Sequence, residues 1–178
     1  MRGEIFLYAD WLPRHVTDEE ANRAAIAYCE GKLQGNPKDG IYWFLKGNCH
    51  YRLGELEEAA KAYSSAIEHG EVSSHAHFFL ALCLIELDRL PEAISSLESQ
   101  LELTPDNPEA LFLLGICLKT QGEHVRGDKL IARVEDIVPG MYAELYADYA
   151  AALAEGVADP LIRKGLEDAV RELRGRGE

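Results

Sequence analysis

The fold is decided by residues 40–141, which divide into three segments of equal length: GIYWFLKGNCHYRLGELEEAAKAYSSAIEHGEVS (40–73), SHAHFFLALCLIELDRLPEAISSLESQLELTPDN (74–107) and PEALFLLGICLKTQGEHVRGDKLIARVEDIVPGM (108–141). Two residue types keep the same place in every segment. These residues are Phe44, Phe78, Phe112, Cys49, Cys83 and Cys117. A fixed repeat of this length is typical of stacked helical hairpins, because one hairpin cannot bury its apolar face without a neighbour. The sequence therefore predicts an all-α repeat protein.

The composition bounds the class of protein. The chain has 178 residues, 47% of them hydrophobic, which is enough for one folded domain with its own core. Its 18 Lys and Arg residues against 31 Asp and Glu residues give a formal net charge of -13. Such a field repels phosphate groups and anionic lipid, and no stretch approaches the length of a membrane span. We therefore expect neither nucleic-acid binding nor membrane insertion.

The N-terminal residues and the cysteines indicate in which cellular compartment the protein is expected. The first ten residues lack the apolar core and the small-residue cleavage site of a signal peptide. The four cysteines include no pair with CxxC spacing, which favours reduced, packed thiols over a disulfide framework. We therefore expect a cytoplasmic protein.

Each segment carries the signals of two helices joined by a turn. Apolar residues recur at helical spacing on both sides of Gly54, Asp88 and Gly122, which mark the turns. Asp39 is expected to cap the first helix. Asp106, Asn107 and Pro108 are expected to supply the cap and the first-position proline of the fifth. The expected units are an N-terminal arm with a degenerate leading helix (1–39), three repeats (40–73, 74–107 and 108–141) and C-terminal helices that cap the stack (142–178).

Further helices are predicted outside the repeats. Thr17 and Glu20 form a capping box, which predicts a helix over about 18–33. Its apolar residues resemble those of the second helix in the first segment, one residue out of step. The matching residues are Ala24, Ala25 and Tyr28 against Ala59, Ala60 and Tyr63. Two more helices are predicted over about 141–155 and 160–173, and the last is amphipathic, as a terminal helix with a polar outer face must be.

These residues resemble the tetratricopeptide repeat (TPR), with its pattern W-x2-L-G-x2-Y followed by A-x3-F and a proline. The matching residues are Trp43, Gly47, Ala59, Tyr63 and Ala66 in the first segment, Leu80, Ala81, Leu84, Ala93, Leu97 and Pro105 in the second, and Leu111, Leu114, Gly115, Leu118, Gly122, Ile131 and Pro139 in the third. The departures are Lys46, His50, His77 and Gly127, which affect local packing. The resemblance implies a right-handed superhelix of stacked antiparallel helix pairs. Its architecture is also similar to that of the small acidic cytoplasmic chaperones of type III secretion.

The resemblance places the first helix of each pair on the concave side of the superhelix. The groove residues that it implies are Ile41, Phe44, Asn48, Tyr51, His75, Phe78, Leu82, Ile85, Glu109, Phe112, Ile116 and Lys119. Most are apolar, so we expect an adaptor or chaperone that holds an apolar helix or extended segment of another protein. The alternative is a self-associating scaffold whose groove is filled by its own N-terminal arm, its terminal helices or a second copy, since so large an apolar patch is rarely left bare.

Other chemistry is not indicated. The subclass of TPR that clamps a carboxylate matches this chain only at Asn48, and Glu109 repels a carboxylate. The cysteines occupy places where the repeat packs small residues, and helices ~8–10 Å apart hold them too far apart for disulfides. His75 and His77 point to different sides of a helix, and no catalytic motif is found. We therefore expect no enzyme, no cofactor and no metal.

Overall fold

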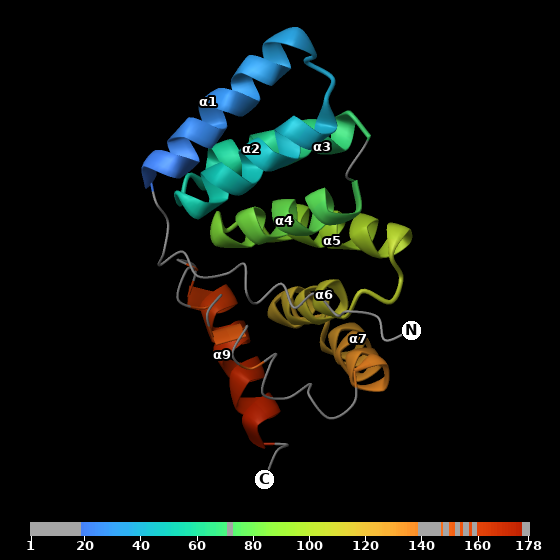
Figure 1. Cartoon of the computed structure of the whole chain (residues 1–178). Helices are drawn as coiled ribbons and strands as arrows, with labels where there is room; N and C mark the ends of the chain where they lie inside the picture. The colour runs from blue at the N-terminus through green and yellow to red at the C-terminus, as the bar shows by residue number, and fades with distance from the viewer. Residues whose placement is uncertain are drawn as a thin grey trace.

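The structure is a computed structural model. It describes residues 19–70, 73–138, 147, 150, 151, 154, 157 and 160–175. The helices are α1 (Glu19–Gly35), α2 (Gly40–Arg52), α3 (Leu56–Glu68), α4 (Ser73–Glu86), α5 (Leu90–Leu103), α6 (Pro108–Thr120), α7 (His124–Ile137) and α9 (Pro160–Gly175). From α1 to α7 each helix packs on the next, so the stack follows the chain from one end of the molecule to the other (Figure 1). The predicted all-α superhelix of antiparallel helix pairs is confirmed.

Within each pair, the two helices pack together through residues at the same repeat positions. A Cβ atom built on Gly47 would lie 2.7 Å from the ring of Tyr63, and one on Gly115 would lie 2.7 Å from Cγ1 of Ile131. The middle pair holds Ala81 and Leu97 at these places, both fully buried. In the first and third pairs a small residue on the first helix thus packs against a bulky one on the second, and the middle pair has residues of the same two kinds at these places.

The turns within the pairs use the residues that the sequence marks. Gly54, Asp88 and Gly122 have φ angles of 74°, 59° and 90°. This left-handed conformation suits glycine, whereas a residue with a Cβ atom is sterically strained there. Asp88 is the non-glycine residue with positive φ in the described part of the chain.

Replacing Asp88 with glycine should therefore raise the free energy of unfolding by about 0.5 kcal/mol, because the relief of strain exceeds the extra freedom of the unfolded chain. Urea denaturation followed by circular dichroism measures it. The matched change Gly122→Ala should lower the free energy of unfolding by about 1 kcal/mol. A loss of stability in Asp88→Gly would show that the aspartate contributes more through its side chain than it costs in backbone strain.

The predicted helix starts are confirmed in part. Asn107 is the N-cap of α6, and its Oδ1 atom accepts a hydrogen bond from the backbone N–H of Ala110 at 2.7 Å. Pro108 lies in the first turn of α6, as expected, and Pro91 lies in the first turn of α5. Asp39 stands at the N-cap of α2 but makes no side-chain cap, and its Oδ1 atom is buried without a hydrogen-bond partner. Its predicted capping bond is therefore wrong.

The leading helix α1 is confirmed, but its predicted register is wrong. Its buried residues are Asn22, Ile26, Cys29 and Leu33. They precede Leu56, Ala60, Tyr63 and Ile67 of α3 by one full repeat length, so α1 is in step with the repeats. Tyr28, on which the shifted register relied, is 59% exposed. The capping box at Thr17 and most of the predicted 141–155 helix lie outside the described residues, and the division into units remains a prediction.

Candidate functional site

The predicted groove is partly exposed at the first helix pair. Ile41 and Leu45 of α2 remain 47% and 43% exposed. With Asn48 and Arg52 they follow each other at helical spacing along one side of α2. The Asn48 carboxamide is held in place, because its Oδ1 atom accepts a hydrogen bond from the Tyr63 hydroxyl at 2.8 Å. We call Ile41, Leu45, Asn48 and Arg52 the first-pair face.

Two tyrosines flank this face. Tyr28 of α1 is largely exposed, and its ring lies 6.1 Å from that of Tyr42 on α2, centroid to centroid and edge to face. The Lys32 ammonium sits 5.2 Å above the Tyr28 ring, an arrangement of the cation–π kind. The hydrogen bond between the two phenols raises the pKa of Tyr42. Amphipathic aromatic rings of this kind are common contact residues in protein interfaces.

The concave side is closed at the second and third pairs. The predicted groove residues buried there are Phe78 (3% exposed), Leu82 (2%), Ile85 (1%), Phe112 (0%) and Ile116 (2%). All five belong to the main core cluster, against which the half-buried Phe44 of the first pair also packs. The row of phenylalanines is thus part of the core in two of the three pairs.

The polar residues of the predicted groove differ in their surroundings. Tyr51 is buried and donates a hydrogen bond to Oε1 of Glu86 at 3.0 Å. His75 is exposed, whereas Glu109 is half-buried and burial raises its pKa. The Lys119 ammonium lies 3.0 Å from Oδ1 of Asp128 on α7. Ile41, His75 and Glu109 hold the same place in successive repeats, near the start of α2, α4 and α6, and none of the three is fully buried.

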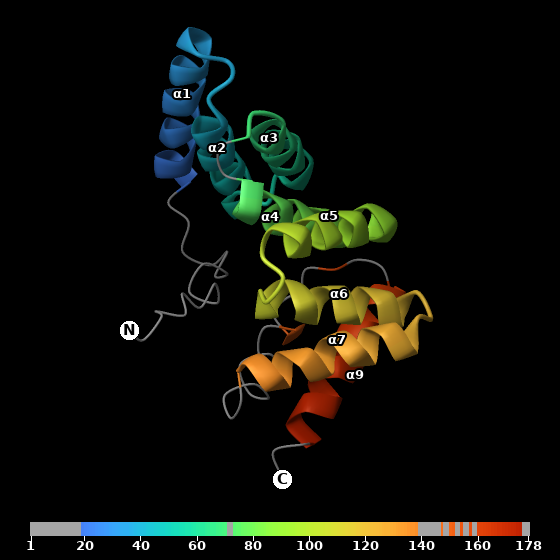
Figure 2. The ribbon, with the colours of Figure 1, turned by 90° about the vertical axis from the view of Figure 1, so that its right-hand side faces the viewer.

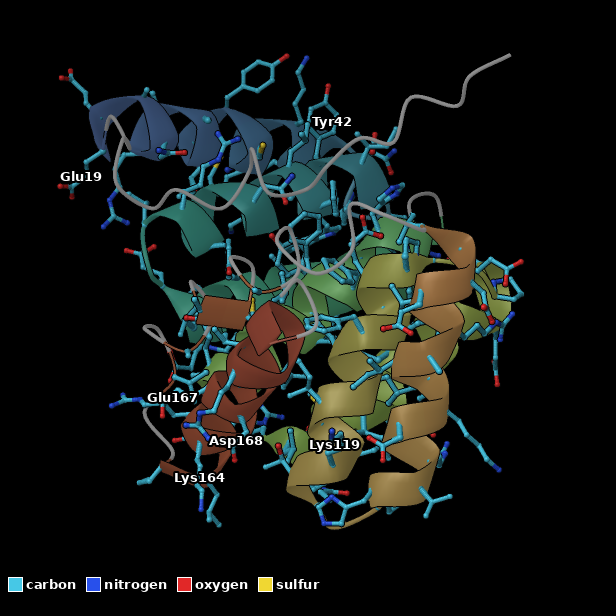
Figure 3. The ribbon with its side chains drawn as sticks, turned by 90° about the horizontal axis from the view of Figure 1, so that it is seen from below. Glu19, Tyr42, Lys119, Lys164, Glu167 and Asp168 are labelled. Atoms are coloured by element: carbon cyan, nitrogen blue, oxygen red, sulfur yellow. The ribbon has the colours of Figure 1, made fainter. Side chains whose placement is uncertain are left out.

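The last helix contributes to the closure of the third pair. In Figures 2 and 3, α9 lies beside α6 and crosses it. Gly165 of α9 comes so close that a Cβ atom there would collide with Oγ1 of Thr120 on α6. Covering by a terminal helix was one of the ways in which the chain could fill its own groove. At the third pair such a helix lies beside Ile116 and Lys119, two of the predicted groove residues.

Thiol and metal chemistry find little support. The four cysteines are free and buried, as expected of core residues. Burial raises the pKa of Cys117 to about 12 and also raises the pKa of Cys29 and Cys49, so these thiols stay protonated at neutral pH. Within the described residues, no three His, Cys, Asp or Glu side chains gather as they must to hold a metal ion. No helix in the described ranges has the length and apolarity that crossing a membrane requires.

The fold and its regular period define a helical-repeat protein built from stacked antiparallel helix pairs. Residues 18–100 match the family model of the anaphase-promoting complex (cyclosome) subunit 3, which is TPR-like. The solved structure of MamA superposes with a TM-score of 0.65 at 18% identity, over 92% of this chain and 98% of MamA. YrrB, described as a TPR protein with an unusual peptide-binding site, superposes with a TM-score of 0.67 at 20% identity, over 88% of this chain and 79% of YrrB. The chain therefore has the fold of the TPR proteins.

A sequence relative is longer than this chain. The cytochrome c-type biogenesis protein CycH of Rhizobium meliloti (strain 1021) is 29% identical over 140 residues, which make up 76% of this chain. The chain spans only 37% of the length of CycH. The similarity therefore covers one part of that protein. TPR folds are typically protein-interaction modules.

Proposed function

We propose that this chain is a non-catalytic interaction module whose first-pair face binds an apolar segment of a partner protein. One observation carries the proposal: Ile41 and Leu45 are 47% and 43% exposed, while Phe79 and Leu113, which hold the place of Leu45 in the next two pairs, are 8% and 0% exposed. At this place in the repeat, apolar surface is thus uncovered at one end of the stack and covered further along. Two adjacent aliphatic side chains beside two tyrosines suit either a helix or an extended segment.

The charges suggest which residues accompany the apolar ones in the partner. Glu109 holds the place of Ile41 two repeats further along, and burial raises the pKa of its carboxyl. The whole chain carries a formal charge of -13. A partner segment that places Lys or Arg beside Glu109 would restore the solvation that this carboxylate lacks. We therefore propose an apolar segment with a basic end.

The relatives narrow the search for the partner. YrrB is described as having a peptide-binding site, which supports peptide binding by a similar fold. CycH is named for cytochrome c-type biogenesis, so we propose proteins of that process as the first candidates. The alternative remains a self-associating scaffold, in which a second copy of this chain covers the first-pair face. Light scattering on the full chain distinguishes the two, since the scaffold requires a dimer or larger assembly.

Changing Leu45 to glutamate should weaken partner binding by at least about tenfold, because a buried charge replaces an aliphatic contact at the centre of the face. The free energy of unfolding should change by less than about 0.5 kcal/mol, since the residue is exposed in the free chain. Pull-down from native cells, followed by titration of the captured segment, measures the binding.

The control is Val125→Glu on α7, where the valine is 72% exposed but far along the stack from α2. This variant should bind the partner as the unchanged chain does. Unaltered binding by Leu45→Glu, at unaltered stability, would remove the first-pair face as the binding surface.

A further inference from the structure

The terminal helix α9 lies where the TPR resemblance places a guest. Ile116 and Lys119, two of the predicted groove residues, line a hollow of about 330 Å³ between α6 and α9. Leu161, Gly165 and Ala169 of α9 form its opposite wall. The concave side of the third pair is therefore a surface on which a helix already lies, supplied by the chain itself.

The residues of α9 have the pattern of a helix bound in a groove. Ile162, Leu166 and Ala169 form one buried stripe, with exposed fractions of 5%, 1% and 8%. Such i, i+4, i+7 anchors are the usual contacts of an amphipathic helix in a groove. Gly165, beside this stripe, allows the close approach to Thr120. On the outer side, Arg171 is exposed and pairs with Asp168 within the helix.

Hollows open to solvent lie on two sides of α9. The hollow towards α6 has a counterpart of about 420 Å³ on another side of α9, lined by Ala151, Ala154, Arg163, Glu167 and Val170. Both hollows are open to solvent, while the stripe Ile162, Leu166 and Ala169 packs into the main core cluster. The helix is thus held by one side only, as a terminal element of the stack. Terminal elements of this kind can open without the rest of the chain unfolding.

We propose that the concave side of the third pair is a helix-binding site, which α9 fills in cis and from which a partner helix of the same pattern can displace it. The pattern is a glycine at the crossing point, with aliphatic or small residues three before it and one and four after it. The lining of the hollow also includes Lys119 of α6, His124 of α7 and Asp168 of α9. The partner helix should therefore carry an acidic residue three positions after its glycine.

This site is separate from the first-pair face. Figure 3 shows Tyr42 and Lys119 well apart, the former beside α1 and the latter where α6, α7 and α9 meet. A module with both sites would bind one partner segment at the first-pair face. At the third pair it would exchange its own α9 for a partner helix. Because a tethered helix acts at an effective concentration of the order of millimolar, a partner helix must bind tightly or α9 must be weakened first.

The test uses a fluorescent peptide of residues 160–175 as the probe, titrated with the full chain and followed by anisotropy. The variant Gly165→Leu leaves α6 unchanged but makes its own α9 collide with Thr120. Its apparent Kd for the peptide should be at least about tenfold lower than that of the unchanged chain, because the site is vacant more of the time. A second variant, Leu166→Glu, releases α9 by another route and should bind equally well.

Two controls make the result specific. Gly31→Leu adds the same side chain to α1, where no atom lies within 4 Å of the added Cβ, and should bind the peptide no better than the unchanged chain. A peptide that itself carries Gly165→Leu should fail to bind the Gly165→Leu chain. If neither α9 variant gains affinity, or if both peptides bind alike, the proposal is wrong.

Hydrogen exchange on the unchanged chain gives an independent answer that does not depend on the folding of any variant. Amides of α9 should exchange at least about tenfold faster than those of α4, because α9 opens without global unfolding. Excess unlabelled peptide should accelerate the exchange of the chain's own α9 further. Exchange of α9 at the rate of α4, unaffected by the peptide, would overturn the proposal.

Discussion

Replacing Phe112 with alanine should lower the free energy of unfolding by about 3–5 kcal/mol, because the change removes a fully buried aromatic side chain and leaves a cavity. Phe112 is 0% exposed at the middle of α6, where all residues from 110 to 118 are buried. Rigid helices on several sides of α6 limit how far the cavity can collapse. Urea denaturation with the full chain measures the effect, and the slope of the transition shows whether it stays two-state.

The matched change is Phe44→Ala, at the same place in the first pair. Phe44 is half-buried, so its loss should lower the free energy of unfolding by only about 1–2 kcal/mol. The difference between the two variants tests whether the phenylalanine row changes from core to surface along the stack. Equal losses would mean that the first pair is covered in solution, and the first-pair face would then not be free to bind a partner.

The burial of the phenylalanines determines which residue should be changed in a binding experiment. The three phenylalanines of the row are among the predicted groove residues, but Phe78 and Phe112 lie in the core. A charge at either place would unfold the chain and say nothing about a partner. Leu45 is the better position, because its side chain is exposed in the free protein.

The helices and turns were predictable because they depend on local spacing. The regular repeat places the left-handed turns at Gly54 and Gly122 and the aspartate at Asp88, and each has the expected conformation. The cap by Asn107 follows from the residue type and the proline after it. Such features need no knowledge of what packs against the helix.

Which residues of the predicted groove are exposed and which are buried could not be predicted from local spacing. Periodicity shows which side of a helix is apolar, but it does not show what covers that side. One signal was present: α2 mixes Lys46, Asn48 and Arg52 among its apolar residues, whereas residues 110–118 of α6 contain no polar side chain apart from Cys117. A helix that is apolar all round is a buried helix, and this points to a cover over α6. Neither Leu45 nor α9 could be assigned to the site without the packing.

The departure from the TPR pattern at Gly127 has a structural reason. A Cβ atom on Gly127 would lie 2.5 Å from the backbone oxygen of Gly115 and 2.6 Å from Cγ of Lys119. The pair α6 and α7 therefore approaches more closely than an alanine at this place allows. Gly115, on the facing helix, contributes to the same close contact, since its own Cβ would lie 3.0 Å from the oxygen of Gly127.

Replacing Gly127 with alanine should consequently lower the free energy of unfolding by about 2–3 kcal/mol, although alanine is the better helix former. The backbone oxygen of Gly115 cannot turn aside as a flexible side chain would, so the two helices must separate and the contact between Gly115 and Ile131 must loosen. Thermal and urea denaturation of the variant measure the loss.

The control for Gly127 is Gly31→Ala on α1, which has open space around the added methyl group. There the higher helix propensity of alanine should act alone and raise the free energy of unfolding by about 0.5–1 kcal/mol. The two changes are chemically identical and should have opposite signs. A neutral or stabilising Gly127→Ala would show that α6 and α7 can move apart at little cost. The surface of α6 that receives α9 would then also be adjustable, and Gly165→Leu would no longer suffice to release α9.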